Sequence, residues 1–329
     1  MARVGDVYTP MQFQLAYNAE TTAGTANVTT MNLLDITALP VIAENAFREA
    51  EAKSGVGRTA KIVDATTITE GQIKQISFTF RPNMDDVMAM IGNCVGLAPE
   101  ATDEILIPYN YTPPTVTIGD TDTDNTGTFT FALVSPVADQ TRVMAGCVVR
   151  SVRVYASAGQ GDPRFLCDVV ADTKVEIAEN QATPGTMSAY SEPSSLNIYS
   201  FCNTSTYNEI DVNLNSVDLL IEGNPYIGGH CSTDYLISRG VPELAVTGNL
   251  VFTHDSNTLD AYQDALTVAE APIVLSNGQN LVITIADTVA TGDIPYQDVD
   301  GITMFTVPFK AIASTSGNLA EVEFKETVV

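Results

Sequence analysis

Two histidines, His230 and His254, are the only imidazole groups in the chain, and this scarcity limits its acid–base chemistry. His254 lies within an alternating strand pattern. The many Ser and Asp residues leave a Ser-His-Asp arrangement open, but no Gly-x-Ser-x-Gly sequence is present to expose a nucleophilic serine. The sequence therefore disfavours a hydrolase, and we predict no enzyme and no catalytic residue.

The cysteines favour free thiols over a disulfide framework or a metal site. Their number is odd and no Cys-x-x-Cys pair occurs, so neither paired disulfides nor a zinc site is indicated. We expect thiols made in a reducing cytosol and mostly buried as small apolar side chains. The five positions are Cys94, Cys147, Cys167, Cys202 and Cys231.

One acidic loop resembles the start of a calcium site. Residues Asp120–Gly127 place carboxylates at every second position, but the sixth position is Asn125 instead of Gly. The twelfth is Phe131, where a bidentate Glu is needed. We favour a solvated hairpin tip whose Asp and Thr side chains bond to their own backbone. The sequence predicts no metal site but leaves cation binding by this loop open.

The glycine and carboxylate pairs have structural explanations. Gly159 and Gly161 stand in a predicted hairpin turn, and residues 226–230 lack the spacing of a dinucleotide fingerprint, so we expect no cofactor. Asp85 and Asp86 are adjacent on a predicted helix, where side chains diverge by about 100°. We interpret them as compensating the helix dipole, not as an acid–base pair.

Charge excludes several classes of function. The 329 residues include 15 Lys+Arg and 40 Asp+Glu, which gives a net charge of −25. Such a surface repels phosphate, so a sequence-reading nucleic-acid binder is disfavoured. No run approaches the roughly 18 apolar residues that span a bilayer. The first residues also lack an apolar secretory run, so we expect a soluble protein without membrane contact or export by a signal peptide.

The elements that must position these residues are mainly strands. Apolar side chains recur with a period of two at residues 76–80, 152–156, 281–285 and 322–324, which predicts half-buried antiparallel strands. Two short helices interrupt them, from about Asn83 to Ile91 with a stop at Gly92, and from about Asn257 to Leu266, each capped by its Asn. Residues 44–53 have a helical composition, but their periodicity is poor and we predict no helix there.

The two strand–helix units predict a duplication. Residues 76–87 align with residues 250–261, and each unit is followed by further strands and a closing hairpin. The hairpins are residues 147–156 with 164–171, and residues 302–313 with 319–325. We therefore predict a mainly β fold of two related β-sandwich or barrel domains, each with a short flanking helix. Their bounds are 1–176 with an N-terminal arm, a linker at 177–193, and 194–329.

A family resemblance extends over four segments of the chain, which are residues 71–80, 145–154, 215–225 and 240–257. The second of these contains the strand sequence Gly-Cys-Val-Val-Arg-Ser. Together they resemble the tail tube (major tail) proteins of long-tailed bacteriophages. The resemblance covers most of the chain through strand order and short apolar patterns. It implies tail-tube-like β domains whose copies form rings that stack around a lumen through which DNA leaves the virion. That family carries no catalytic residues.

The resemblance also implies partners and a location. The partners are other copies of the chain, a tape-measure protein, and tail terminator and distal tail proteins, while DNA passes without sequence-specific binding. The location is the virion tail, assembled in the host cytoplasm. The duplication allows a ring of three two-domain chains or of six chains, and we favour three.

Two alternatives remain from the residues alone. One is another virion structural protein, namely a tail terminator, a head-decoration protein or a surface-array subunit. The other is a β-sandwich carbohydrate-binding or adhesin module. This second alternative normally exposes an aromatic platform, and the chain has no Trp.

Overall fold

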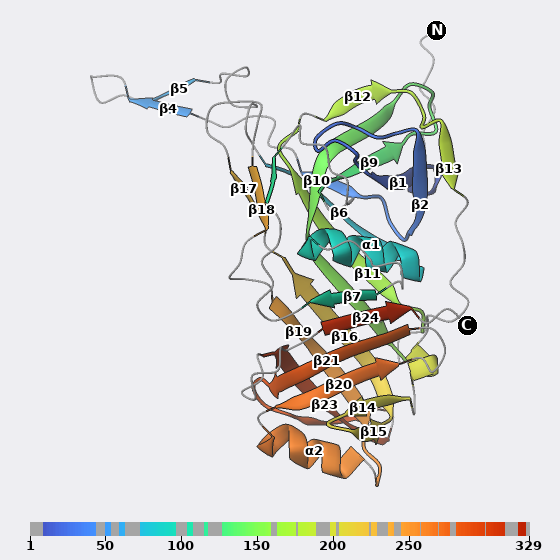
Figure 1. The fold of residues 1–329 in the computed structure, drawn as a ribbon, viewed down its shortest axis with the longest axis vertical. Helices are drawn as coiled ribbons and strands as arrows, with labels where there is room; N and C mark the ends of the chain where they lie inside the picture. Colours follow the sequence, from blue (N-terminus) through green and yellow to red (C-terminus); the bar gives the residue numbers. More distant parts are fainter. Residues whose placement is uncertain are drawn as a thin grey trace.

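The computed structural model describes residues 9–43, 50–53, 59–62, 73–96, 104–107, 115–117, 127–158, 163–175, 177–188, 198–201, 204–223, 225–228, 236–239, 245–256, 258–268, 270–276, 281–299, 301–312 and 322–326. Over these ranges the chain is mainly β with two α-helices, as predicted (Figure 1).

The helices and strands follow one another along the whole described chain. The helices are η1 (Pro10–Gln12), α1 (Met84–Val95), η2 (Ile198–Phe201) and α2 (Thr258–Thr267). The strands up to the predicted linker are β1 (Gln14–Ala19), β2 (Thr30–Ile36), β3 (Val41–Ala43), β4 (Ala50–Lys53), β5 (Thr59–Ile62), β6 (Lys74–Arg81), β7 (Glu104–Ile107), β8 (Thr115–Thr117), β9 (Phe129–Val134), β10 (Thr141–Ser157) and β11 (Leu166–Thr173). The remaining strands are β12 (Ala178–Gln181), β13 (Thr186–Ser188), β14 (Ser205–Tyr207), β15 (Ile210–Val212), β16 (Leu214–Glu222), β17 (Pro225–Gly228), β18 (Leu236–Arg239), β19 (Ala245–Thr253), β20 (Ala271–Ser276), β21 (Leu281–Ala290), β22 (Tyr296–Val299), β23 (Ile302–Ala311) and β24 (Val322–Glu326).

The predicted alternation of side chains is present in β6 and β10. Ile76, Phe78 and Phe80 are buried in β6, while Ser77 and Thr79 between them are partly exposed. The second part of β10 buries Val152, Val154 and Ala156 in the same way. This pattern places apolar side chains on one face of a sheet and polar ones on the other, as expected for half-buried antiparallel strands.

Six strands of the first half close into a barrel. β1 pairs with β2 and β9, β9 with β10, β10 with β11, β11 with β6, and β6 returns to β2 through Asp35↔Arg81 and Ile36↔Phe80. Closure leaves no open edge within this ring of strands. The interior is filled by aromatic side chains, among which Phe78 and Phe131 make an edge-to-face contact with ring centroids 5.4 Å apart.

β10 connects the barrel to the second half of the chain. Its first part pairs with β9, and its second part pairs with β11 on one side and β16 on the other. Register shifts between Met144 and Cys147, and between Val149 and Ser151, mark irregularities where this long strand changes partners. The sheet therefore continues through both halves in the order β3, β6, β11, β10, β16, β19, β23, β22, antiparallel throughout.

A second layer packs against the second half of this continuous sheet. β21 pairs with β20 and β24, and β20 pairs with β14, which pairs with β15. Tyr207, Phe252 and Phe305 are buried in an apolar core that continues into the barrel. The predicted closing hairpin is wrong, because β24 pairs with β21 and β7, and β21 also pairs with the end of β23. β21 thus lies between β23 and β24, which would be direct neighbours in a hairpin.

Several strands cross the predicted domain boundary. β7 pairs with β24, and β8 pairs with β18 in a small sheet with β17, so both join strands of the second half. β12 and β13 lie within the predicted linker at 177–193 and pair with β10 and β2. The division into two domains is therefore not confirmed, and the bounds 1–176 and 194–329 stay a prediction.

Helix α1 begins where predicted and ends later. Asn83 is the N-cap, and its side-chain oxygen accepts a hydrogen bond from the Asp86 N–H at 2.7 Å. The predicted stop at Gly92 is wrong, because the helix continues to Val95 and ends at Gly96, which has a left-handed φ of 79°. Cys94 and Val95 are buried, and their burial offsets the roughly 1 kcal/mol that a glycine costs inside a helix.

Helix α2 also lies close to its predicted position, and Asp255 and Thr258 bond to each other at its start. The Thr258 N–H donates to Asp255 Oδ1 at 3.0 Å, and the Asp255 N–H donates to Thr258 Oγ1 at 2.8 Å. This reciprocal pair satisfies two backbone donors before the first turn. The predicted cap, Asn257, lies outside the described residues. Residues 50–53, from the segment of helical composition, form β4, which pairs with β5.

Candidate functional site

The structure places only some of the residues that the sequence singles out. His254 follows β19, and its ring meets Tyr296 and Phe305 edge-on at centroid distances of 5.5 and 6.4 Å. It is thus part of an aromatic cluster. The other candidates lie outside the described residues: His230, residues 120–126 of the acidic loop, Gly159, Gly161, Cys202 and Cys231.

The described cysteines are buried and free. Cys94, Cys147 and Cys167 form no disulfide with one another. Burial, followed by nearby carboxylates, raises the pKa of the Cys147 and Cys167 thiols well above the ordinary value, which disfavours the reactive thiolate. No group of three or more His, Cys, Asp or Glu side chains that suits a metal ion occurs among the described residues.

Glu20 is a buried carboxylate that the sequence did not reveal. Its two oxygens accept hydrogen bonds from the Gly24 N–H at 2.7 Å, the Gly146 N–H at 2.8 Å, the Thr130 hydroxyl at 2.7 Å and the Thr128 hydroxyl. Desolvation raises the pKa of Glu20, while these four donors lower it. Its donors come from Thr128 just before β9, from β9 and β10, and from its own turn, so Glu20 ties strand ends together instead of facing a substrate.

Asp86 is a second buried carboxyl and is less well satisfied. Its Oδ1 accepts a hydrogen bond from the Tyr17 hydroxyl at 2.8 Å, while its Oδ2 is buried with no hydrogen-bond partner among the described residues. Burial is the largest cause that raises the pKa of Asp86 to about 6, and Asp85 adds to it. Asp86 therefore does more than compensate a helix dipole, because it is a buried carboxyl of raised pKa that is hydrogen-bonded to Tyr17 of the barrel.

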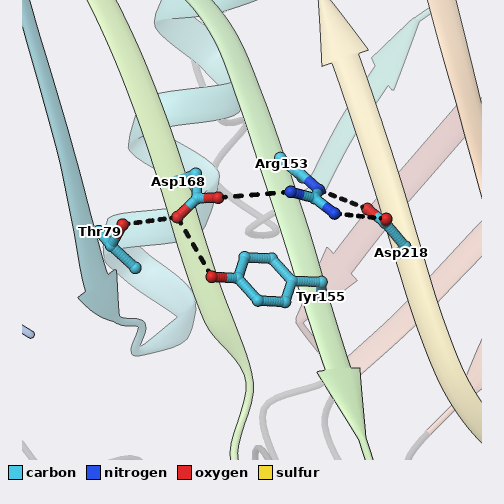
Figure 2. A network of polar contacts seen from close by, with 5 residues as sticks. All are labelled: Thr79, Arg153, Tyr155, Asp168 and Asp218. Carbon is cyan, nitrogen blue, oxygen red and sulfur yellow. Dashed lines mark hydrogen bonds and ion pairs between the residues drawn. The ribbon is translucent and has the colours of Figure 1, made fainter.

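The solvent-facing side of the continuous sheet carries a polar network at the junction of the two halves. We call this side, made by the outward residues of β6, β11, β10, β16, β19 and β23, the open face. Figure 2 shows Arg153 of β10 between Asp168 of β11 and Asp218 of β16. Arg153 Nε and Nη2 each lie 2.7 Å from an Asp218 oxygen, and Arg153 Nη1 lies 3.8 Å from Asp168 Oδ2. Asp168 also accepts the Thr79 hydroxyl at 2.7 Å.

The carboxylates of this network keep Arg153 charged and accept hydrogen bonds from its guanidinium group. The hydrogen bonds from Arg153 to Asp218 are the largest cause that raises its pKa, with smaller contributions from both carboxylates. The guanidinium also lies over the Tyr155 ring, 4.8 Å from its centroid. Exposed ion pairs contribute only about 0–1 kcal/mol each to stability. The stronger consequence is that the Arg153 donors already have acceptors within the protein.

Other arginines at the open face and around the barrel are also paired with carboxylates. Arg81 lies 3.5 Å from Asp35, and Arg150 lies 3.5 Å from Asp172. Arg142, on the first part of β10, lies 2.7 Å from Glu179. A phosphate approaching these side chains must compete with a carboxylate at each of them.

No protein-family model matches the chain, and no curated protein matches it. No helix in the described ranges is long and apolar enough to cross a membrane. Within those ranges, the Arg153 network is an arrangement of paired charged side chains on the open face.

Sequence reasoning missed this network for a physical reason. The alternation of β10 predicts that Arg153 faces outward, but Asp218 is 65 positions away along the chain. Only the pairing of β10 with β16, which places Tyr155 opposite Asp218, brings the two charges together. No local signal in the sequence marks Glu20 or Asp86 as buried either.

Proposed function

We propose that the chain is a structural subunit of a bacteriophage tail tube, which joins copies of itself into stacked rings around a conduit for DNA. The observation that carries this proposal is the single antiparallel sheet that passes through both halves of the chain. One face of that sheet belongs to the core, and the other is polar and open. A wall subunit needs such a broad face, and joined copies extend it around a lumen.

The charge distribution supports passage of DNA without binding. The chain has a net charge of −25, and Arg81, Arg150 and Arg153 are each held by a carboxylate. Free arginines would retain phosphates, whereas paired ones compete poorly for them. A lumen lined by the open face would therefore let DNA slide with little friction.

The proposal includes no catalysis. The chain works through its surfaces, with the tape-measure, terminator and distal tail proteins as further partners and the virion tail as its location. The continuous sheet in one chain suits three chains per ring, because each chain then supplies two consecutive wall segments.

Sedimentation of the purified protein tests the proposal. We expect rings and larger assemblies that coexist with monomer and grow with protein concentration. A strictly monomeric protein at every concentration and salt level, or a defined small-molecule ligand bound stoichiometrically, would contradict it.

A further inference from the structure

Two groups of exposed apolar side chains flank the continuous sheet. We call residues 37–43, which include β3, the first margin; its most exposed large side chain is Val41, at 64%. The second margin comprises α2 and β22 with the start of β23. It exposes Leu266 at 57% and Tyr296 at 46%, together with Leu259 and Ile302. β3 and β22 stand at opposite ends of the strand order.

The apolar surface of the second margin is continuous from helix to strand. Leu259, Tyr262 and Leu266 stand at positions i, i+3 and i+7 of α2, so they share one helix face. The Tyr262 ring packs on the Tyr296 ring of β22 with centroids 4.6 Å apart. In Figure 1, α2 lies at the end of the molecule remote from the N-terminus. Exposed apolar groups gathered in this way mark contact sites more often than isolated ones do.

The first margin has no charge. Its sequence is Thr-Ala-Leu-Pro-Val-Ile-Ala, with Leu39 and Val41 exposed. The second margin carries the exposed carboxylates Asp260 and Asp298 at its border. Two copies of a chain with a net charge of −25 repel one another, so a contact is less unfavourable where one of the two surfaces carries no charge. The first margin has no charged residue and therefore adds no repulsion against the acidic border of the second margin.

The strand edges are compatible with the same contact. Among the described residues, β3 pairs only with β6, and β22 pairs only with β23. Each margin therefore presents one side of a short edge strand next to its apolar side chains. Such edges accept a further strand from another chain.

We propose that the second margin of one copy docks on the first margin of another copy, head to tail. This inference rests on the proposed function and specifies its self-contact. Because the two surfaces differ, the contact is heterologous, and repetition closes a ring or continues as a filament. Leu266 and Tyr296 of one copy pack against Leu39 and Val41 of the next, and the uncharged segment approaches the acidic border.

Two complementary variants test the pairing. Val41→Asp damages only the first margin, and Leu266→Asp damages only the second. We expect each variant alone to need at least a tenfold higher concentration than wild type to assemble, measured by sedimentation velocity. Mixed in equal amounts, the two retain one intact contact between them, so the average mass rises toward a dimer and no further. Met11→Asp, at a fully exposed residue outside both margins, is the matched control and assembles as wild type does.

The outcomes separate this inference from the proposed function. Variants that assemble as wild type does, or a mixture that stays monomeric while circular dichroism shows both variants folded, would overturn the docking of these margins. Wild-type protein that never assembles would instead overturn the proposed function itself.

Discussion

Asp86 couples the stability of the fold to pH. Its pKa is raised from 3.8 to about 6, so the folded chain binds this proton more tightly than the unfolded chain does. Protonation of Asp86 therefore raises the unfolding free energy as pH falls through 6, and this stabilisation is lost at neutral pH. A shift of this size corresponds to about 3 kcal/mol between the two protonation states.

Asp86→Asn is therefore expected to change the pH dependence of unfolding. Between about pH 7.5 and about pH 5, the unfolding free energy of the variant should rise by about 1 kcal/mol less than that of wild type, because the proton-binding group is gone. Urea titrations at each pH measure this difference. The neighbouring, exposed Asp85→Asn is the control and should keep most of the wild-type slope, because burial contributes more than Asp85 to the raised pKa of Asp86. Equal slopes for Asp86→Asn and wild type would contradict the role of Asp86.

The Arg153 clamp makes a second prediction at this scale. Replacing both Asp168 and Asp218 by Asn removes the two carboxylates that hold Arg153. We expect retention of double-stranded DNA to increase several-fold at low salt and to disappear at high salt, as phosphate contacts do. Electrophoretic mobility of DNA with assembled protein measures it. The double variant Asp85→Asn with Asp293→Asn changes the net charge by the same amount but leaves the partners of Arg153 in place, so it is the control. Equal DNA retention by the two double variants would contradict the proposal that Asp168 and Asp218 keep Arg153 from binding phosphate.

At the scale of elements, two glycines allow close backbone contacts between neighbouring elements. A Cβ on Gly223 would lie 2.2 Å from the Cys94 carbonyl oxygen at the end of α1. A Cβ on Gly248 of β19 would lie 2.4 Å from the Asp218 carbonyl oxygen of β16. Both obstacles are backbone atoms, so relief requires movement of whole elements.

Gly223→Ala and Gly248→Ala should each lower the unfolding free energy by about 2 kcal/mol or more, as expected for overpacking against backbone. Gly185→Ala is the control, because the nearest atom to its Cβ is the Thr29 carbonyl oxygen at an ordinary 3.5 Å. Chemical denaturation measures all three. Alanine variants at Gly223 and Gly248 as stable as the Gly185 control would contradict this packing.

Local patterns predicted the elements, while their partners required the structure. The alternation of β6 and the Asn83 cap depend on neighbours within a few residues, so the sequence was sufficient for both. The stop at Gly92 failed because burial of Cys94 and Val95 outweighed a local propensity. The closing hairpin failed because β21, which precedes both strands in the chain, pairs with β23 and with β24. Burial of Asp86 and the Arg153 clamp depend on similar long-range pairing, which no local pattern encodes.

At the scale of the whole molecule, net charge should govern assembly. A chain of charge −25 repels its copies, and salt screens this repulsion, with a Debye length of about 3 Å at 1 M. We expect the concentration needed for assembly to fall as salt rises, measured by light scattering across a salt series. Assembly that weakens with salt would instead indicate contacts dominated by ion pairs between copies.

Electron microscopy of the assembled protein shows whether copies of this chain build a hollow wall. We predict rings or tubes with an open axis, lined by the sheet face that carries Arg153, with three chains per ring as the expected symmetry. Six chains per ring would change only the predicted number of chains and would leave the hollow wall in place. Solid particles, or single copies whose two margins stay free in solution, would contradict the claim.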